Sequence, residues 1–157
     1  MAKNTSNRLS SGHVLRIKTP IGIAYAICTH RDAICGHLIR VMGDLHNNEI
    51  SHLDKLFGKE EAFSIFFLWG SNVDKSLVDI VGRIAIPEHM ANFPLFKAGI
   101  VNQRTGKVDH WWLWDGNKEW PVGKLTVDQR LLPLREIWNE VLLVERIAAG
   151  WRASDVH

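Results

Sequence analysis

The sequence predicts a single α+β domain in which a strongly bent antiparallel sheet, or a partly open SH3-like barrel, is covered by a C-terminal helix. The chain has 157 residues, of which 46% are hydrophobic and 23% are charged, and this fits one globular domain rather than two. Short segments of strand character follow one another closely, and helical periodicity dominates only near the C-terminus. Residues 1–11 are polar and are expected to form a flexible tail, and residues 12–157 are expected to form the domain.

The sequence of the first part of the domain predicts a meander of three strands. Residues 13–18 form the first strand, and residues 23–28 are apolar on both faces, which is typical of a central strand. Residues 37–42 form the third strand. Thr19-Pro20-Ile21-Gly22 supplies one turn and Arg31-Asp32 begins the next. Strands this close in sequence pair with each other directly and need no crossover helix.

Residues 43–58 interrupt the strands because their pattern predicts a short helix. Asn47 or Asn48 can cap this helix, and Gly58 stands where a helix ends. Its apolar stripe would consist of Ile50, Leu53, Leu56 and Phe57. Further strands are expected over residues 63–69, 78–86 and 95–101.

A hairpin and a helix are predicted for the C-terminal third. Residues 110–114 and 119–122 flank Asp115-Gly116, which is the strongest short hairpin signal in the chain. The main helix is expected to run from Pro133, which suits a first turn, to Ala148. Its apolar positions recur at helical spacing at Leu134, Ile137, Trp138, Val141, Val144 and Ala148.

Composition excludes several classes of protein. The longest apolar run, residues 65–69, is far shorter than the roughly 18 residues of a membrane span, so no contact with a membrane is expected. Residues 1–12 lack the apolar core of a secretion signal, and a cytoplasmic protein is therefore expected. The 19 Lys and Arg nearly balance the 17 Asp and Glu, and no run reaches five like charges. We therefore do not expect nucleic acid as the main partner.

The two cysteines leave two alternatives. If the chain reverses at Arg31-Asp32, Cys28 and Cys35 would lie opposite each other on paired strands and could form a disulfide. In a reducing compartment two small buried thiols are the favoured interpretation. Cys28 lies within an apolar strand, where burial raises the pKa of a thiol and makes it a poor nucleophile.

The densest group of potential metal ligands comprises Asp44, His46, Glu49, His52 and Asp54, and the first four are the candidates for a metal site. Glu49 and His52 are three residues apart and could share a helix face, but a carboxylate-bridged site needs a second such pair on a facing helix. The sequence offers no second pair, so we expect no metal and no cofactor, and we interpret the group as a solvated face. Nucleophile-elbow and phosphate-loop motifs are absent, and no catalytic residue is predicted. A hydrolase whose site is assembled from distant residues remains an alternative.

Tryptophan gives the best functional lead. The chain has seven, and four of them surround the Asp115-Gly116 turn: Trp111, Trp112, Trp114 and Trp120. Trp112 and Trp114 share one strand face and Trp111 takes the other, so one face should meet the core and the other solvent or a partner. Tryptophan is enriched at binding hot spots, and the predicted partner-binding residues are Trp112, Trp114, Asp115 and Trp120.

Two other interpretations of these tryptophans stay open. The hairpin can curl over Trp112 and Trp114 so that both serve the core. Alternatively, an SH3-like module could stack exposed aromatic rings on single-stranded nucleic acid, a mode that also requires a basic groove. Lys107, Lys118 and Lys124 lie nearby, but neighbouring acidic residues offset them.

Segments spread along the domain resemble the immunity protein 26 family of bacterial polymorphic toxin systems. The resemblance lies in residues 12–17 and 22–26, in the strand Val78-Asp79-Ile80-Val81-Gly82-Arg83-Ile84-Ala85-Ile86-Pro87, and in Leu132-Pro133-Leu134 with the helix that follows. It implies a cytoplasmic, non-catalytic protein that neutralises a cognate toxin by binding it. Inhibitors of nucleases tend to be acidic, and this chain has a net charge of +2, so we assign no activity to the toxin. The expected partner is a cognate toxin or another protein, and the sequence indicates no oligomeric state.

Overall fold

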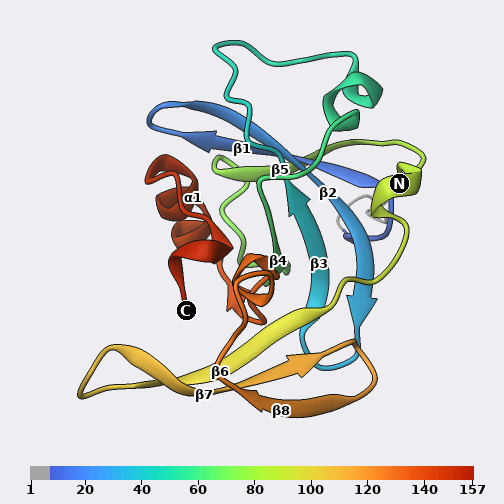
Figure 1. Cartoon of the computed structure of the whole chain (residues 1–157). Helices are drawn as coiled ribbons and strands as arrows, with labels where there is room; N and C mark the ends of the chain where they lie inside the picture. Colours follow the sequence, from blue (N-terminus) through green and yellow to red (C-terminus); the bar gives the residue numbers. More distant parts are fainter. Residues whose placement is uncertain (1–7) are drawn as a thin grey trace.

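A computed structural model describes residues 8–157 and shows two β-sheets and one C-terminal α-helix (Figure 1). The large sheet has the strand order β5-β1-β2-β3-β4-β9, with bounds β1 His13–Thr19, β2 Gly22–Asp32, β3 Gly36–Val41, β4 Phe63–Phe67, β5 Val78–Arg83 and β9 Ile137–Trp138. The second sheet has the order β6-β7-β8, with bounds β6 Phe96–Asn102, β7 Lys107–Trp114 and β8 Glu119–Gly123. Helix α1 spans Glu140–Ala148, and short 3-10 turns cover Leu53–Phe57, Glu88–Met90, Gln129–Leu131 and Ala153–Asp155.

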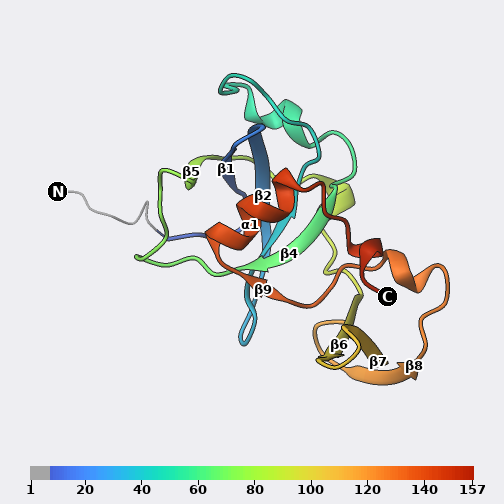
Figure 2. The ribbon, with the colours of Figure 1, turned by 90° about the vertical axis from the view of Figure 1, so that its left-hand side faces the viewer.

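These elements confirm the predicted α+β class, the bent sheet and the C-terminal helix. Of the two predicted sheet forms, the described strands do not close into a barrel, because they divide between two sheets (Figure 2). All neighbouring strands of the large sheet are antiparallel except β9, which runs parallel to β4 and makes the sheet mixed. No helix in the described part of the chain combines the length and apolar character of a membrane span.

The meander β1-β2-β3 forms where the turn residues predict it. Gly22 and Gly36 begin the second and third strands at φ values of 141° and 91°, which favour glycine. The reversal between β2 and β3 lies beyond Asp32, so Cys28 pairs with Ile39 while Cys35 stays in the turn. Both cysteines are free, and the disulfide alternative is not realised. Burial raises the pKa of Cys28 to about 12, as expected for an inert thiol.

One face of the large sheet carries the main core beneath α1. Leu143 and Ile147 of the helix pack on residues of β1 to β4. The helix begins later than predicted, because the Asn139 side chain caps it by accepting a hydrogen bond from the Leu142 N–H at 2.9 Å. Trp138 therefore lies in β9 and not in the helix. Its backbone is bound beside β4, because the N–H of Leu68, the residue after β4, donates to the Trp138 carbonyl at 2.9 Å.

The opposite face is covered by residues 43–58, where the predicted helix is wrong. Only Leu53–Phe57 form a 3-10 turn. The backbone of the preceding residues bonds to the sheet instead, since His46 and Ile23 exchange two hydrogen bonds at 2.8 and 2.9 Å. The Ile50 N–H donates to the Tyr25 hydroxyl at 2.8 Å. Backbone groups used in this way cannot form helical hydrogen bonds.

The second sheet packs on the large sheet through aromatic side chains. Phe96 and Trp114 meet Leu38 and Phe66 in a separate buried cluster. Residues 133–138 link the two sheets, because Lys97 exchanges backbone hydrogen bonds of 2.9 Å with Pro133 and Arg135, and Phe66 N–H donates to the Glu136 carbonyl at 3.2 Å. In Figure 1 the second sheet lies below the large one, and its β6-β7 hairpin projects to the left.

Residues before position 12, where the domain was predicted to start, already pack against the sheet. Residues 1–7 of the expected tail lie outside the described part of the chain. Leu9 is buried in the main core, and the Gly12 N–H donates to the Cys28 carbonyl at 2.8 Å. The tail predicted for residues 1–11 therefore includes residues that belong to the fold, because an apolar side chain at position 9 finds room beside the sheet.

Candidate functional site

A β-bulge shapes the projecting β6-β7 hairpin. The register shifts between Gly99 and Val101, because Ile100 of β6 lies opposite two residues of β7, Asp109 and His110. The Ile100 side chain is 88% exposed. Glycine is required beside it, because a Cβ at Gly99 would lie 2.3 Å from Cγ1 of Val108. Ile100 is thus exposed to solvent on β6, directly opposite the bulge in β7.

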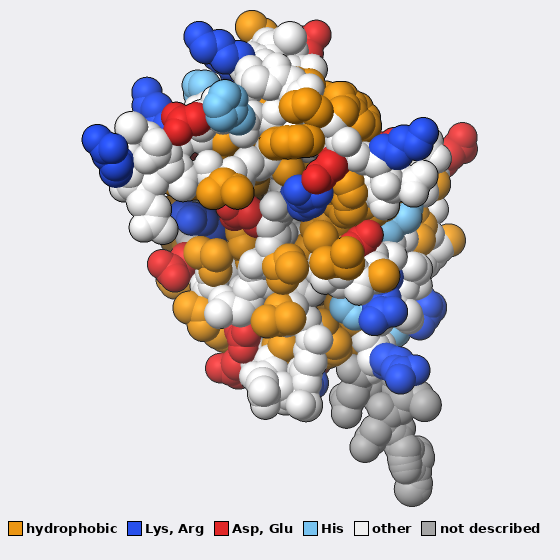
Figure 3. Space-filling view, turned by 90° about the horizontal axis from the view of Figure 1, so that it is seen from below, with side chains coloured by type: hydrophobic (Ala, Val, Ile, Leu, Met, Phe, Trp, Pro, Cys, Tyr) orange, Lys and Arg blue, Asp and Glu red, His pale blue; other side chains and the backbone are white. Residues whose placement is uncertain are grey.

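A groove of about 510 Å³ lies beside this bulge, and we call it the Trp112 groove. Its apolar part consists of Ala98, Ile100, Val101 and Trp112, with Trp112 38% and Val101 46% exposed. Its polar rim consists of Asn102, Asp109, His110, Glu119 and Arg135. Seen from the side of the second sheet, hydrophobic side chains gather over much of the surface with single charged groups among them (Figure 3). An apolar centre with a polar rim is the usual anatomy of a protein-binding surface.

Arg135 supports one side of this groove. Its guanidinium lies 5.0 Å from the centre of the Trp114 ring and donates to the Glu119 carboxylate at 2.9 Å. Arg135 lies in the segment that joins the two sheets, and Glu119 lies on β8. Their ion pair therefore connects this linking segment to β8, and both charged side chains border the groove.

The four residues predicted to bind a partner do not form one surface. Trp112 lines the groove, but Trp114, on the same face, is only 8% exposed because Phe66, Phe93 and Phe96 surround it. The alternative in which the hairpin curls over a tryptophan therefore applies to Trp114. Trp120 pairs with Leu113, so it lies on the opposite face of the sheet, where it is 38% exposed.

Asp115 has a structural role in the β7-β8 turn. Its carboxylate accepts hydrogen bonds from the Lys118 N–H at 2.7 Å and the Asn117 N–H at 2.9 Å. These backbone hydrogen bonds, that of Lys118 first, lower the pKa of Asp115. Sequence reasoning missed Ile100 and Val101, although an apolar pair just before the Gln103-Arg104-Thr105-Gly106 turn was the available signal.

The four candidate metal ligands do not come together in one site. Asp44 forms an ion pair with Lys59 at 2.7 Å, and Glu49 forms one with Arg16. The His46 ring packs edge-on against Tyr25 at 5.6 Å, and His52 is an exposed residue before the 3-10 turn. Across residues 8–157 no three His, Cys, Asp or Glu side chains gather as metal ligands would.

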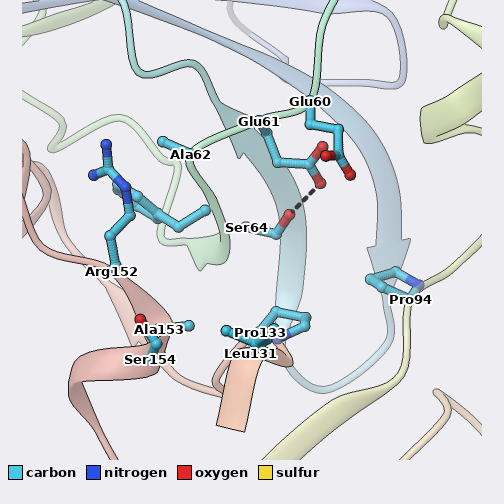
Figure 4. A pocket seen from close by; sticks show the side chains of 11 residues that line it. Glu60, Glu61, Ala62, Ser64, Pro94, Leu131, Pro133, Arg152, Ala153 and Ser154 are labelled. Carbon is cyan, nitrogen blue, oxygen red and sulfur yellow. Dashed lines mark hydrogen bonds between the residues drawn. The ribbon is translucent and has the colours of Figure 1, made fainter. Parts of the chain in front are cut away.

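A smaller cavity of about 330 Å³ opens between Glu61, Ser64, Pro133 and Arg152 (Figure 4). The Ser64 hydroxyl donates to the Glu61 carboxylate at 2.9 Å, and Arg40 donates to the same oxygen at 2.9 Å. Burial alone would raise the pKa of Glu61, but hydrogen bonds from its own backbone and from Arg40 lower it overall. The carboxylate is thus held ionised in a structural ion pair, and a carboxylate poised as a general base would need a raised pKa.

Comparison with protein-family models, with curated proteins and with solved structures finds no match for this chain. The resemblance to the immunity protein 26 family therefore stays a prediction from the sequence.

Proposed function

We propose that this chain is a non-catalytic protein-binding module that holds an apolar segment of a partner protein in the Trp112 groove. The observation that carries the proposal is the exposure of Ile100, Val101 and Trp112 around one groove on a projecting hairpin. Burying apolar surface contributes about 25 cal/mol per Å², so covering these side chains favours association. Contiguous apolar surface with a polar rim is a recurrent mark of interaction sites.

The charges of the rim favour binding of a specific partner over non-specific hydrophobic association. Asp109 and Glu119 are acidic and Arg135 is basic, so a partner with charges of matching sign is oriented as it docks. A cognate toxin, acting in the cytoplasm, is the partner that the family resemblance implies, and we propose this class as the occupant.

Ile100→Asp is the sharpest test because it places a charge in the apolar centre of the groove. Fully burying an isoleucine contributes about 1.5–3 kcal/mol, so this variant should bind the partner at least about tenfold more weakly. Ile34→Asp is the matched control, since Ile34 is 90% exposed in the turn between β2 and β3. Each protein serves as bait in a lysate of the source organism, and the affinity of the captured protein is then measured by calorimetry.

Capture by the parent and by Ile34→Asp, with loss in Ile100→Asp, supports the proposal. Equal capture by both variants contradicts the groove assignment. A parent that retains nucleic acid and no protein would favour the alternative of a nucleic-acid-binding module, whose binding to single-stranded oligonucleotides would weaken with salt. Turnover of a substrate by the parent would favour the hydrolase alternative.

A further inference from the structure

A cavity of about 730 Å³ lies away from the Trp112 groove. It is formed by the first described residues, the paired ends of β2 and β3, and the loop after β4. Its volume falls within the range of about 300–1,000 Å³ that small-molecule sites occupy. Its charged and aromatic lining consists of Arg8, Arg31, His37, Trp69 and Lys75.

The charged side chains that line this cavity are all cationic. Arg8, Arg31 and Lys75 line it, and no Asp or Glu does. Within residues 8–157 none of these three cations forms an ion pair. The Lys75 ammonium lies 5.0 Å from the centre of the Trp69 ring, which fixes its position at the wall. Like charges around a shared cavity repel one another, and an anion between them would relieve that repulsion.

His37 adds a neutral donor to the same wall. It pairs with Arg31 across β2 and β3, and burial first, then the charge of Arg31, lowers its pKa. Its Nδ1 is buried with no hydrogen-bond partner in the described part of the chain. Nε2 is not buried in this way, so a ring protonated at Nε2 presents an N–H through which it can meet a ligand.

We propose that this cavity binds a small phosphate-bearing anion, held by Arg8, Arg31 and Lys75 with a hydrogen bond from His37. Guanidinium groups bind phosphate through two parallel hydrogen bonds, and an ammonium adds a point charge, which suits a phosphate better than a single carboxylate. The three cations match the two to three negative charges of a phosphate monoester or a diphosphate. The proposal goes beyond protein binding, and its test needs no partner protein.

The test uses the full chain and inorganic pyrophosphate as the probe, titrated at constant ionic strength maintained with chloride. The Trp69 indole resonance in NMR reports from the cavity wall. The parent should show a saturable shift, and Arg31→Gln and Lys75→Gln should each weaken affinity by about tenfold, as expected for the loss of one charged contact. The double variant Lys107→Gln, Lys124→Gln is the control, because it removes two cations from a different cavity.

Melting temperature in chloride alone checks that each variant is folded. An unsaturable response of the parent overturns the proposal, and so does equal affinity in the double variant Arg31→Gln, Lys75→Gln. A second arm uses vesicles that contain phosphatidic acid, since a lipid headgroup carries the same phosphate chemistry. Binding to vesicles without binding of free pyrophosphate would also overturn the assignment to a small soluble anion.

Discussion

Replacing Arg40 by methionine should lower the free energy of unfolding by about 3–5 kcal/mol, the usual cost of removing one partner of a buried ion pair. The Arg40 side chain is only 5% exposed. Its Nη1 donates to Glu61 at 2.9 Å and its Nε to the Thr29 hydroxyl at 3.0 Å. Its Nη2 donates to the Asn92 carbonyl at 3.0 Å. Methionine keeps much of the volume and leaves these acceptors unsatisfied.

The exposed ion pair between Lys59 and Asp44 provides the control. Its two side chains are 65% and 54% exposed, so Lys59→Met should cost at most about 1 kcal/mol. Both variants are unfolded with urea, and the midpoints are compared at an unchanged slope. If Arg40→Met costs as little as Lys59→Met, the account of Arg40 as a buried cation that its hydrogen bonds hold in place is refuted.

Three further predictions concern stability. Trp138→Ala should cost about 3–5 kcal/mol by calorimetric melting, because its ring is 1% exposed, and a melt like that of the parent would contradict its place in the core. Trp114→Ala should cost about as much, whereas Trp112→Ala should cost far less, and equal losses would show that the groove is not open. Burial lowers the pKa of His13, His30 and His37 below the usual 6.5, so these side chains bind protons more readily in the unfolded chain, and stability is lost as the pH falls through 6.5. The melting temperature should therefore fall between about pH 7.5 and pH 5.5, and a constant value would contradict the burial of these histidines.

The elements that local chemistry determines could be predicted from the sequence. Gly22 and the Asp115-Gly116 pair mark their turns directly, and the strands around them lie close to where they were expected. The failures occur where distant backbone groups compete. Within residues 43–58, where a helix was predicted, His46 pairs with Ile23 of β2. Trp138 pairs with β4, and in both cases partners far away in sequence satisfy the backbone.

The same distinction explains the candidate sites. Trp112 was predicted because a tryptophan-rich hairpin is visible in the sequence. The exposure of Ile100 was not predicted, since it depends on how β6 pairs with β7, where two residues of β7 lie opposite this one residue. The burial of Trp114 depends on Phe66 and Phe93, which come from elsewhere in the fold. The cationic cavity joins residues 8, 31 and 75, whose proximity only the tertiary structure reveals.

Hydrogen–deuterium exchange of the chain with and without its captured protein partner tests the central claim most directly. The account predicts that the partner slows exchange in residues 98–102 and 109–113, which form the two strands beside the Trp112 groove, and leaves the turn around Ile34 unchanged. Protection confined to other surfaces, with unchanged exchange in the β6-β7 hairpin, would contradict it.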